Sequence, residues 1–241
     1  MNYASDRISA IFAMGAGDLT PASLRHAAQV LYAPVSRDAE LSKQCASVLS
    51  DAELQRADRF ADEYDKAQFE QRRAFRRFCA ATALGSSQPL SEIVFEETEN
   101  GRPYLSESPD YWFSFSACRF GLLGAWSSTH AIGVDLEDRT QDVEARELAQ
   151  QFFSVAEAEA VEAVGGPQRL RTFYRFWSLK EAALKSIGEG MPFGLDAFKF
   201  ELEPRLRVVH APPDYGGPER FSAHVIEEAH CCAALVIRSR A

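Results

Sequence analysis

The chain has 241 residues, 46% of them hydrophobic, which is enough for one large domain or two small ones with real hydrophobic cores. Its formal net charge of −9 and its isoelectric point near 5.1 argue against a nonspecific nucleic-acid-binding protein, which would be basic. Residues 1–20 lack a basic start followed by a long apolar run, and no apolar run approaches membrane-spanning length, so we expect a cytoplasmic protein with no membrane segment.

In chain order, the first elements are predicted from their apolar patterns and helix caps. Residues 8–14 alternate enough for a first strand, and Thr20 with Pro21 is a good start for a helix. The apolar stripe of that helix would be Leu24, Ala27, Ala28 and Leu31. Ser50 and Glu53 form a capping box for the next helix. Its apolar residues would be Leu54, Ala57, Phe60 and Ala61.

A longer helix is predicted over about residues 65–84, with Gly85 as its C-cap. It carries a cluster of arginines at positions Arg72, Arg73, Arg76 and Arg77. A solvated helix face is the ordinary interpretation of such a cluster. The alternative is a phosphate-facing patch, because the guanidinium group pairs well with phosphate oxygens.

Strands and turns dominate the middle of the sequence. Strands are predicted at residues 93–95, 111–115, 122–126 and 132–136, and Asn100 to Pro103 is a turn. The link between the last two strands, residues 127–130, is short. We therefore expect those two strands to form an antiparallel pair.

The second half of the chain again mixes helices and strands. Ser154 and Glu157 form another capping box, and Pro167 opens a long helix that Gly188 follows. Strands are predicted at 197–202, 206–210, 221–227 and 231–237. Helices and strands in both halves, without regular βαβ alternation, favour the α+β class.

Two segments carry residues suited to chemistry. In the strand predicted at 131–138, alternation puts Asp135 and Glu137 on one face, where two carboxylates repel unless a cation lies between them. Mg²⁺ suits such oxygen ligands, although a solvated edge strand would also carry charges. In the helix at 177–185, Trp177, Glu181 and Lys185 share a stripe, which by itself fits an ordinary surface ion pair.

Together the two segments resemble the 4'-phosphopantetheinyl transferases, specifically the larger type that activates peptide, polyketide and siderophore synthetases. The family pattern is a Gly-[Val/Ile]-Asp-[Leu/Ile]-Glu strand followed by a Trp-Ser-x-Lys-Glu-Ala-x-x-Lys helix, here Gly133 to Glu137 and Trp177 to Lys185. A Phe-Phe-Ser-x-x-Glu helix start lies between them at 152–157, and a Gly-[Lys/Arg]-Pro turn lies upstream at 101–103. The resemblance covers roughly residues 50 to 237.

The resemblance implies two similar α+β halves in a pseudo-two-fold arrangement, with the active site in the cleft between them. The halves would be residues 1–128 and 129–241, the second of which carries the metal site. Arg102 and Ser116 would reach the cleft from the first half. A monomer is expected.

The implied reaction transfers the 4'-phosphopantetheine arm of coenzyme A to a serine of an acyl or peptidyl carrier protein, with release of 3',5'-ADP. By resemblance, Asp135, Glu137 and Glu181 hold Mg²⁺, Glu181 is the base, and Lys185 neutralises the pyrophosphate or protonates the leaving group. The coenzyme-binding residues would be Arg73, Arg77, Arg102, Ser116 and Lys185. Lys180 is a weaker candidate, because it points about 100° away from Glu181 on a helix.

The sequence also departs from the family. Where the family has a histidine that contacts the 3'-phosphate of coenzyme A, this chain has Ala117. One alternative is therefore a degenerate relative that binds coenzyme A or a carrier protein without transfer. A metal-dependent nuclease is the other alternative, but its Glu-x-Lys residues normally share one strand, whereas Lys180 and Glu181 lie in a helical pattern. We expect no nucleic-acid partner.

The five cysteines form no CxxC pair and no metal-ligand spacing, and they are Cys45, Cys79, Cys118, Cys231 and Cys232. Their number is odd. Free thiols in a reducing compartment are therefore the simplest prediction.

Overall fold

The structure is a computed structural model that describes residues 17, 18, 20, 24–227 and 230–240. Helices and strands are mixed in both halves of the described chain, so the predicted α+β class is confirmed. The strand predicted at 8–14 lies outside the described residues.

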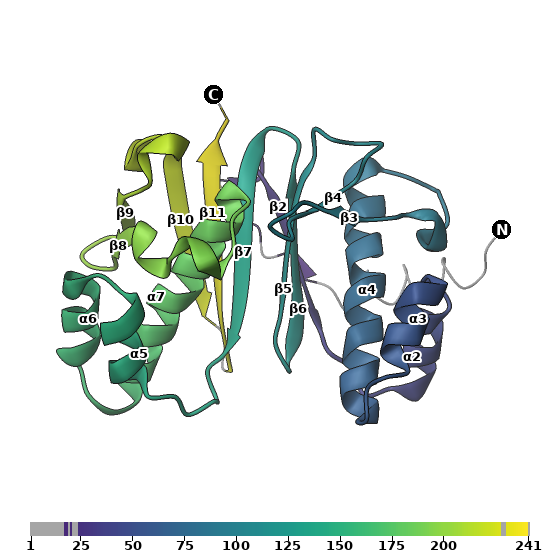
Figure 1. The fold of residues 1–241 in the computed structure, drawn as a ribbon, viewed down its shortest axis with the longest axis horizontal. Coiled ribbons are helices and arrows are strands. Elements are labelled where there is room, and N and C mark those ends of the chain that lie inside the picture. The colour runs from purple at the N-terminus through teal and green to yellow at the C-terminus, as the bar shows by residue number, and fades with distance from the viewer. Residues whose placement is uncertain (1–16, 19, 21–23, 228–229, 241) are drawn as a thin grey trace.

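The first half builds a four-stranded sheet in the order β1-β2-β6-β5, covered on its outer side by helices (Figure 1). The sheet strands are β1 (Gly17–Asp18), β2 (Gln29–Pro34), β5 (Trp112–Ala117) and β6 (Gly121–Ser127). The helices are α2 (Ala39–Ala46), α3 (Asp51–Ala57) and α4 (Glu63–Leu84). A small ribbon of β3 (Glu96–Glu97) and β4 (Pro103–Tyr104) lies beside them.

The second half builds a three-stranded sheet in the order β10-β11-β7, with α7 lying across it (Figure 1). Its strands are β7 (His130–Asp138), β10 (Phe221–Glu227) and β11 (Cys231–Ser239). The helices are α5 (Ala145–Phe152), α6 (Val155–Glu162) and α7 (Gly166–Ile187). The short strands β8 (Lys199–Glu201) and β9 (Arg207–His210) pair with each other.

Helix α7 packs very closely on β7 at Gly133. A Cβ atom at this position would lie 1.9 Å from the carbonyl oxygen of Ala182, closer than any real contact. The glycine is therefore needed for the close approach of helix and strand. This contact sets the position of the Glu181 and Lys185 side chains relative to the strand carboxylates.

The two sheets meet along β5 and β7, which lie next to each other at the centre of the molecule (Figure 1). They are not joined by a backbone ladder; instead, the Val134 amide donates a hydrogen bond of 3.0 Å to the Ser114 hydroxyl. An apolar cluster fills the space between the sheets. Its members from the two halves include Val30, Leu123, Ala125, Ile132, Val134, Leu136, Leu235 and Ile237.

The predicted antiparallel pair of strands 122–126 and 132–136 is wrong. Strand β6 pairs with β2 and β5, whereas β7 pairs with β11. The reason is local, because the Ser127 hydroxyl accepts hydrogen bonds from the amides of Thr129 (3.2 Å) and His130 (2.9 Å) and donates to the Ala27 carbonyl. This side-chain turn leads the chain into a second sheet instead of a hairpin.

The helix predicted from Thr20 is also wrong in its described part. A short turn at Leu24 to Ala27 leads directly into strand β2, whose Val30 amide donates to the Thr20 hydroxyl at 2.8 Å. Pairing with β6 outweighs the helical spacing of the apolar residues. Residues 93–95 are not a strand either, since the pairing begins at Glu96.

Most helix boundaries follow the predicted caps. The capping boxes at Ser50 and Ser154 are present, and the long helices end at Gly85 and Gly188, which both have left-handed backbone angles. The α3 helix is shorter than predicted, because it ends at Ala57. Among the described residues, no helix is both long enough and apolar enough to span a membrane.

Candidate functional site

The strand β7 and the helix α7 bring Asp135 and Lys185 into direct contact. The Lys185 ammonium donates to the Asp135 carboxylate at 2.8 Å and to the Val134 carbonyl at 3.2 Å. The Ser116 hydroxyl, from β5, donates to the same Asp135 oxygen at 3.0 Å. Asp135 is only 4% exposed, so the solvated-edge interpretation of this strand does not hold. Residues from both halves thus converge on one buried carboxylate.

Glu137 and Glu181 add two half-buried carboxyl groups beside this contact. Burial and the charge of Asp135 raise the pKa of Glu137 to about 8, against the opposing effects of Lys185 and the Trp177 indole. Burial also raises the pKa of Glu181, with Asp135 adding to the effect and Lys185 opposing it. Three carboxyl groups therefore share one nearby ammonium, and their mutual repulsion opposes the ionisation of all three together.

A cavity of about 180 Å³ opens next to these groups, between α7 and the first half. Glu181 and Lys185 line one side of it, and Arg102 and Arg76 line another. The Arg102 guanidinium stacks over the Trp112 ring at 4.2 Å, and its stem lies against Gly188 at the end of α7. Burial and the nearby Arg240 lower the pKa of Arg102. The pocket thus combines cations with carboxylates.

A neighbouring cavity of about 230 Å³ contains Ala117, the position at which the chain departs from the family. Arg72 and Arg76 line this cavity together with Ser116. Arg76 borders both cavities. Burial, together with repulsion from Arg73, lowers the pKa of Arg76 to about 10, so it remains a cation at neutral pH.

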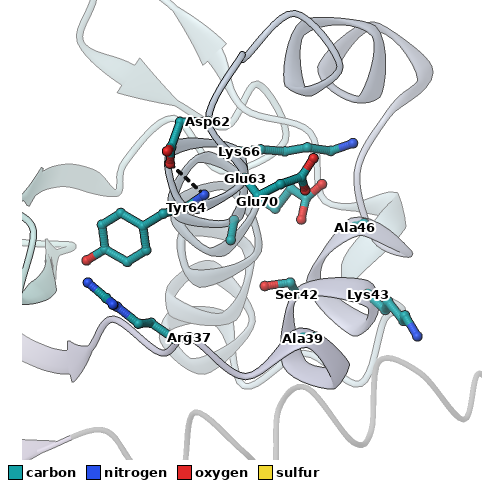
Figure 2. Close-up of a pocket in the computed structure, with 11 residues that line it drawn as sticks. Arg37, Ala39, Ser42, Lys43, Ala46, Asp62, Glu63, Tyr64, Lys66 and Glu70 are labelled. Atoms are coloured by element: carbon teal, nitrogen blue, oxygen red, sulfur yellow. Dashed lines mark hydrogen bonds between the residues drawn. The ribbon is translucent and has the colours of Figure 1, made fainter.

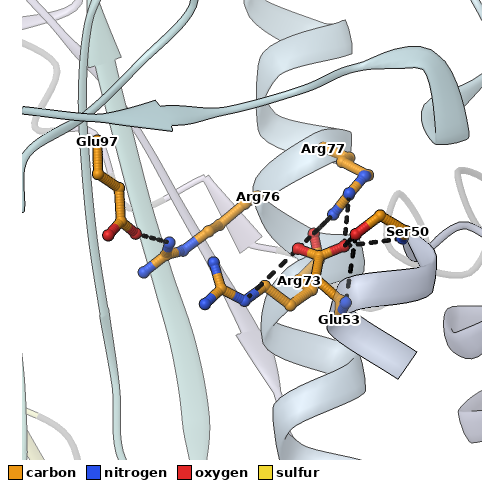
Figure 3. Close-up of polar contacts among 6 residues, drawn as sticks. All are labelled: Ser50, Glu53, Arg73, Arg76, Arg77 and Glu97. Carbon is orange, nitrogen blue, oxygen red and sulfur yellow. Dashed lines mark hydrogen bonds and ion pairs between the residues drawn. The ribbon is translucent and has the colours of Figure 1, made fainter. Parts of the chain in front are cut away.

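The arginines of α4 fall on two faces of the helix (Figure 3). Arg77 is 6% exposed and donates to the Glu53 carboxylate at 2.7 Å and 3.3 Å, and Arg73 lies 3.6 Å from the same carboxylate. Arg76 points the other way, toward Glu97, at 3.6 Å. Arg102, Glu181 and Lys185 therefore line the first cavity and Ser116 lines the second, whereas Arg77 forms an ion pair with Glu53 and lines neither.

Lys180 lies in the core behind the site and is 0% exposed. Its ammonium forms an ion pair with Glu157 at 2.8 Å and donates to the carbonyls of Leu195 and Phe198 at 3.0 and 2.7 Å. Burial lowers the pKa of Lys180, and the charge of Glu157 opposes that effect. Lys180 therefore lies in the core whereas Glu181 faces the cavity, and helical geometry predicts such different positions for adjacent residues.

The oxygen atoms of these three carboxyl groups are suitable ligands for a hard cation. One oxygen of Asp135, Oδ2, is buried without a hydrogen-bond partner, and Glu137 and Glu181 offer further oxygen ligands. Within the described part of the chain, no three His, Cys, Asp or Glu side chains are already gathered closely enough to hold a metal ion. Lys185 occupies one Asp135 oxygen instead.

A larger cavity, about 780 Å³, lies away from this site between α2 and the start of α4 (Figure 2). Arg37, Tyr64 and Glu70 are among its lining residues. None of the predicted site residues lines this cavity, so cavity volume alone does not identify the candidate site.

Sequence reasoning missed Ser114, which lines the first cavity, and left open which of the four α4 arginines faces the cleft. Ser114 shares the strand face of Ser116 by simple alternation, and its hydroxyl is the group that receives the Val134 amide. Arg76 belonged to a recognised cluster, but the acidic Glu53 that diverts Arg73 and Arg77 lies in another helix. Alternation could have identified Ser114, whereas the choice among arginines needed the tertiary structure.

Comparison with known proteins agrees with the geometry. A family model described as the 4'-phosphopantetheinyl transferase superfamily matches residues 131–234. A phosphopantetheinyl transferase of Thraustochytrium sp. is 29% identical over 206 residues, which are 78% of this chain and 70% of that protein.

Two bacterial relatives extend the comparison. The 4'-phosphopantetheinyl transferase psf-1 of Bacillus pumilus is 27% identical over 143 residues, 59% of this chain and 60% of that protein. A 4'-phosphopantetheinyl transferase of Bacillus subtilis is 32% identical over 161 residues, 66% of this chain and 70% of that protein. The matches thus span 60% to 70% of the three relatives' lengths. The chain belongs to the 4'-phosphopantetheinyl transferase superfamily.

Proposed function

We propose that this protein transfers the 4'-phosphopantetheine arm of coenzyme A to a serine of an acyl or peptidyl carrier protein and releases 3',5'-ADP. The observation that carries the proposal is the 2.8 Å contact between Lys185 and Asp135, which joins the two family motifs at the edge of a cation-lined cavity. The names of the relatives support the same activity.

The side chains around the cavity can be assigned roles. Arg102 and Lys185 offer positive charge to the pyrophosphate of coenzyme A and to the leaving phosphate. Glu181 is the candidate to accept the proton of the carrier serine, because its carboxyl group lines the cavity beside Lys185. Ser116 holds Asp135 in position through its hydrogen bond.

Asp135, Glu137 and Glu181 would hold Mg²⁺. The support is the unpartnered Asp135 oxygen and the excess of carboxyl groups over nearby cations. When bound, the ion would supply positive charge to the phosphate oxygens of the coenzyme.

Arg72 and Arg76 would bind the 3'-phosphate of the coenzyme in place of the missing histidine. Both line the cavity that contains Ala117, and the Arg76 guanidinium lies 3.6 Å from Glu97 and over the Phe115 ring at 5.3 Å. The sequence also predicted that Arg73 and Arg77 bind the coenzyme. Both side chains form ion pairs with Glu53, so we assign only Arg73 to coenzyme binding, and at a greater distance than Arg76.

The two-half arrangement is part of the proposal, with the boundary between residues 128 and 129. Each half has a sheet covered by a helix of 22 residues that ends in a left-handed glycine, Gly85 in one and Gly188 in the other. The cleft residues come from both sides of that boundary. The protein would act as a cytoplasmic monomer.

The test is incubation of the purified protein with coenzyme A, Mg²⁺ and a panel of apo carrier proteins, followed by intact-mass measurement. At least one carrier should gain the mass of a single phosphopantetheine arm, and chelation should abolish the gain. Binding of coenzyme A without any transfer, across a broad panel, would favour the degenerate relative instead.

A further inference from the structure

Two cysteines from opposite halves of the chain meet at the junction of the sheets. Cys118 directly follows β5, and Cys231 is the first residue of β11. Their sulfur atoms are 3.6 Å apart although the residues are 113 positions apart in the sequence. A disulfide has an S–S distance of about 2.05 Å, so the two sulfurs would have to move about 1.5 Å closer to form one.

The pair is largely buried beside a turn of the chain. Cys118 is 9% exposed and Cys231 is 5% exposed, and both belong to the apolar cluster between the sheets. Cys118 begins the tight turn that leads into β6, where its amide donates to the Gly121 carbonyl at 3.0 Å. The residual exposure of Cys118 is the route by which a small oxidant would reach the pair.

The surroundings of Cys118 favour its thiolate. Contact with Cys231 and the amides of Phe120 and Gly121 lower the pKa of Cys118 to about 7, while burial and the charge of Asp138 oppose the shift. The pKa of Cys231 is raised by the Cys118 contact and by burial. The amides of Phe120 and Gly121 act on the Cys118 sulfur, so Cys118 is the thiol better placed to ionise and attack.

We propose that Cys118 and Cys231 form a redox modification site at which a peroxide oxidises the pair to an intramolecular disulfide. The Cys118 thiolate attacks one peroxide oxygen, the O–O bond breaks, and Cys118 becomes a sulfenic acid with release of hydroxide. The Cys231 thiol then loses its proton, its sulfur attacks the Cys118 sulfur, and the S–O bond breaks. In sum, two thiols and one hydrogen peroxide give one disulfide and two waters.

The other cysteines are poorly suited to this chemistry. Burial raises the pKa of Cys45 to about 12 and that of Cys79 well above its usual range. Burial likewise raises the pKa of Cys232 to about 12, and this residue packs in the α7 core on the opposite face of β11. The structure gives none of these three a sulfur partner among the described residues.

The disulfide would join the two sheets covalently. Cys118 lies two residues beyond Ser116, whose hydroxyl holds Asp135, so the link would fix the end of the strand that borders the cleft. Because the bond would close a loop of more than a hundred residues, oxidation should raise Tm by roughly 5 °C or more. This modification does not depend on the proposed transferase reaction.

The test treats the folded, fully reduced protein with a few equivalents of hydrogen peroxide and measures intact mass and Tm. The expected product is about 2 Da lighter, melts higher and returns to the starting mass with dithiothreitol. A mass gain without any loss of two hydrogens, or thiols that react only after denaturation, would overturn the proposal.

Adjacent residues provide the matched control. Cys231→Ala and Cys118→Ala should abolish the loss of about 2 Da, whereas Cys232→Ala should retain it. Peptide mapping of the Cys232→Ala protein should recover a linked peptide that contains positions 118 and 231. Circular dichroism checks that each variant is folded, and a bond between Cys231 and Cys232 in the wild type would contradict the assignment.

Discussion

Lys180 and Glu181 are adjacent in the sequence, but we expect substitution of Glu181 to lower activity and substitution of Lys180 to lower stability. Glu181→Gln keeps the shape of the side chain and removes its charge, so carrier modification should fall by at least about 100-fold with little change in Tm. Lys180→Met leaves the Glu157 carboxylate buried without its partner and should cost about 3–5 kcal/mol of stability. Denaturant unfolding and the mass assay separate the two effects. Similar losses of stability in both variants would contradict the placement of the two side chains.

Arg76 and Arg77 are likewise adjacent, and only one of them borders the cavities. Arg76→Ala should weaken coenzyme A binding about ten-fold to a hundred-fold, because a charge-assisted contact to phosphate contributes roughly 1.5–3 kcal/mol. The same variant should bind 3'-dephospho-coenzyme A almost normally. Calorimetry with both ligands measures the difference. Arg77→Ala is the control, since it should lower stability without changing the preference between the ligands.

The ion-paired carboxyl group of Glu53 should make the stability of the protein depend on pH. Burial raises the pKa of this carboxyl, but hydrogen bonds and charge from Arg77, Ser50 and Arg73 outweigh burial, and the net shift is downward. A lowered folded-state pKa stabilises the fold above the unfolded value, about 4.3, and this contribution is lost as the pH falls through the folded pKa.

Glu53→Gln should therefore cost about 1–3 kcal/mol at pH 7, where the native carboxylate is charged and paired with the buried Arg77. The difference between wild type and variant should shrink as the pH falls below about 4. Denaturant unfolding at several pH values measures it. A difference that stays constant from neutral to acidic pH would show that this carboxyl does not titrate differently in the folded state.

At the scale of elements, local signals predicted helices well and strand pairing poorly. The capping boxes at Ser50 and Ser154 and the terminal glycines act on residues close in sequence, so their effect can be recognised without a fold. The prediction of a hairpin between β6 and β7 was wrong because the Ser127 hydroxyl forms a turn with the amides of Thr129 and His130. The same hydroxyl donates a hydrogen bond to the carbonyl of Ala27, which is distant in sequence. Such a partner is invisible in the local pattern.

Gly133 is the element-scale residue with the clearest expected effect. A methyl group at this position would meet the Ala182 carbonyl at 1.9 Å, so helix α7 must move away from β7 in Gly133→Ala. The variant should lose about 1–3 kcal/mol or more of stability, and activity should fall further because Lys185 moves from Asp135. Gly165→Ala is the control, since a Cβ there meets no atom within 4 Å and the backbone φ of −120° suits alanine. Equal stability of the two variants would argue against the close packing.

At the scale of the whole molecule, the sequence predicted which side chains share a face better than how distant elements meet. Strand alternation put Asp135 on one face of its strand, and helix spacing put Glu181 and Lys185 on one face of theirs, whereas their proposed roles came from the resemblance to the family. The position of Arg102 against Gly188 and the diversion of Arg77 to Glu53 arise from contacts between elements remote in sequence. Those contacts depend on how the two sheets pack along β5 and β7, which periodicity does not encode.

The shared cluster between the sheets leads to the last prediction, which concerns the independence of the halves. Leu123 and Ala125 from the first half pack with Ile132, Val134 and Leu235 from the second, all at most 2% exposed. Separate chains of residues 1–128 and 129–241 would each expose this apolar surface to water, where burial is worth about 25 cal/mol per Å². Neither chain alone should therefore fold cooperatively.

Mixing the two chains should restore cooperative unfolding, because the cluster then regains its partner surface, and carrier modification should return together with it. Circular dichroism, thermal melting and the mass assay follow the separate and mixed chains. The intact protein, cut by an engineered protease site between Ser128 and Thr129, is the control for the loss of covalent connection. If the separate 129–241 chain melts cooperatively near the Tm of the intact protein, then the sheet β10-β11-β7 does not need the first half, and the cluster contributes less to stability than its burial implies.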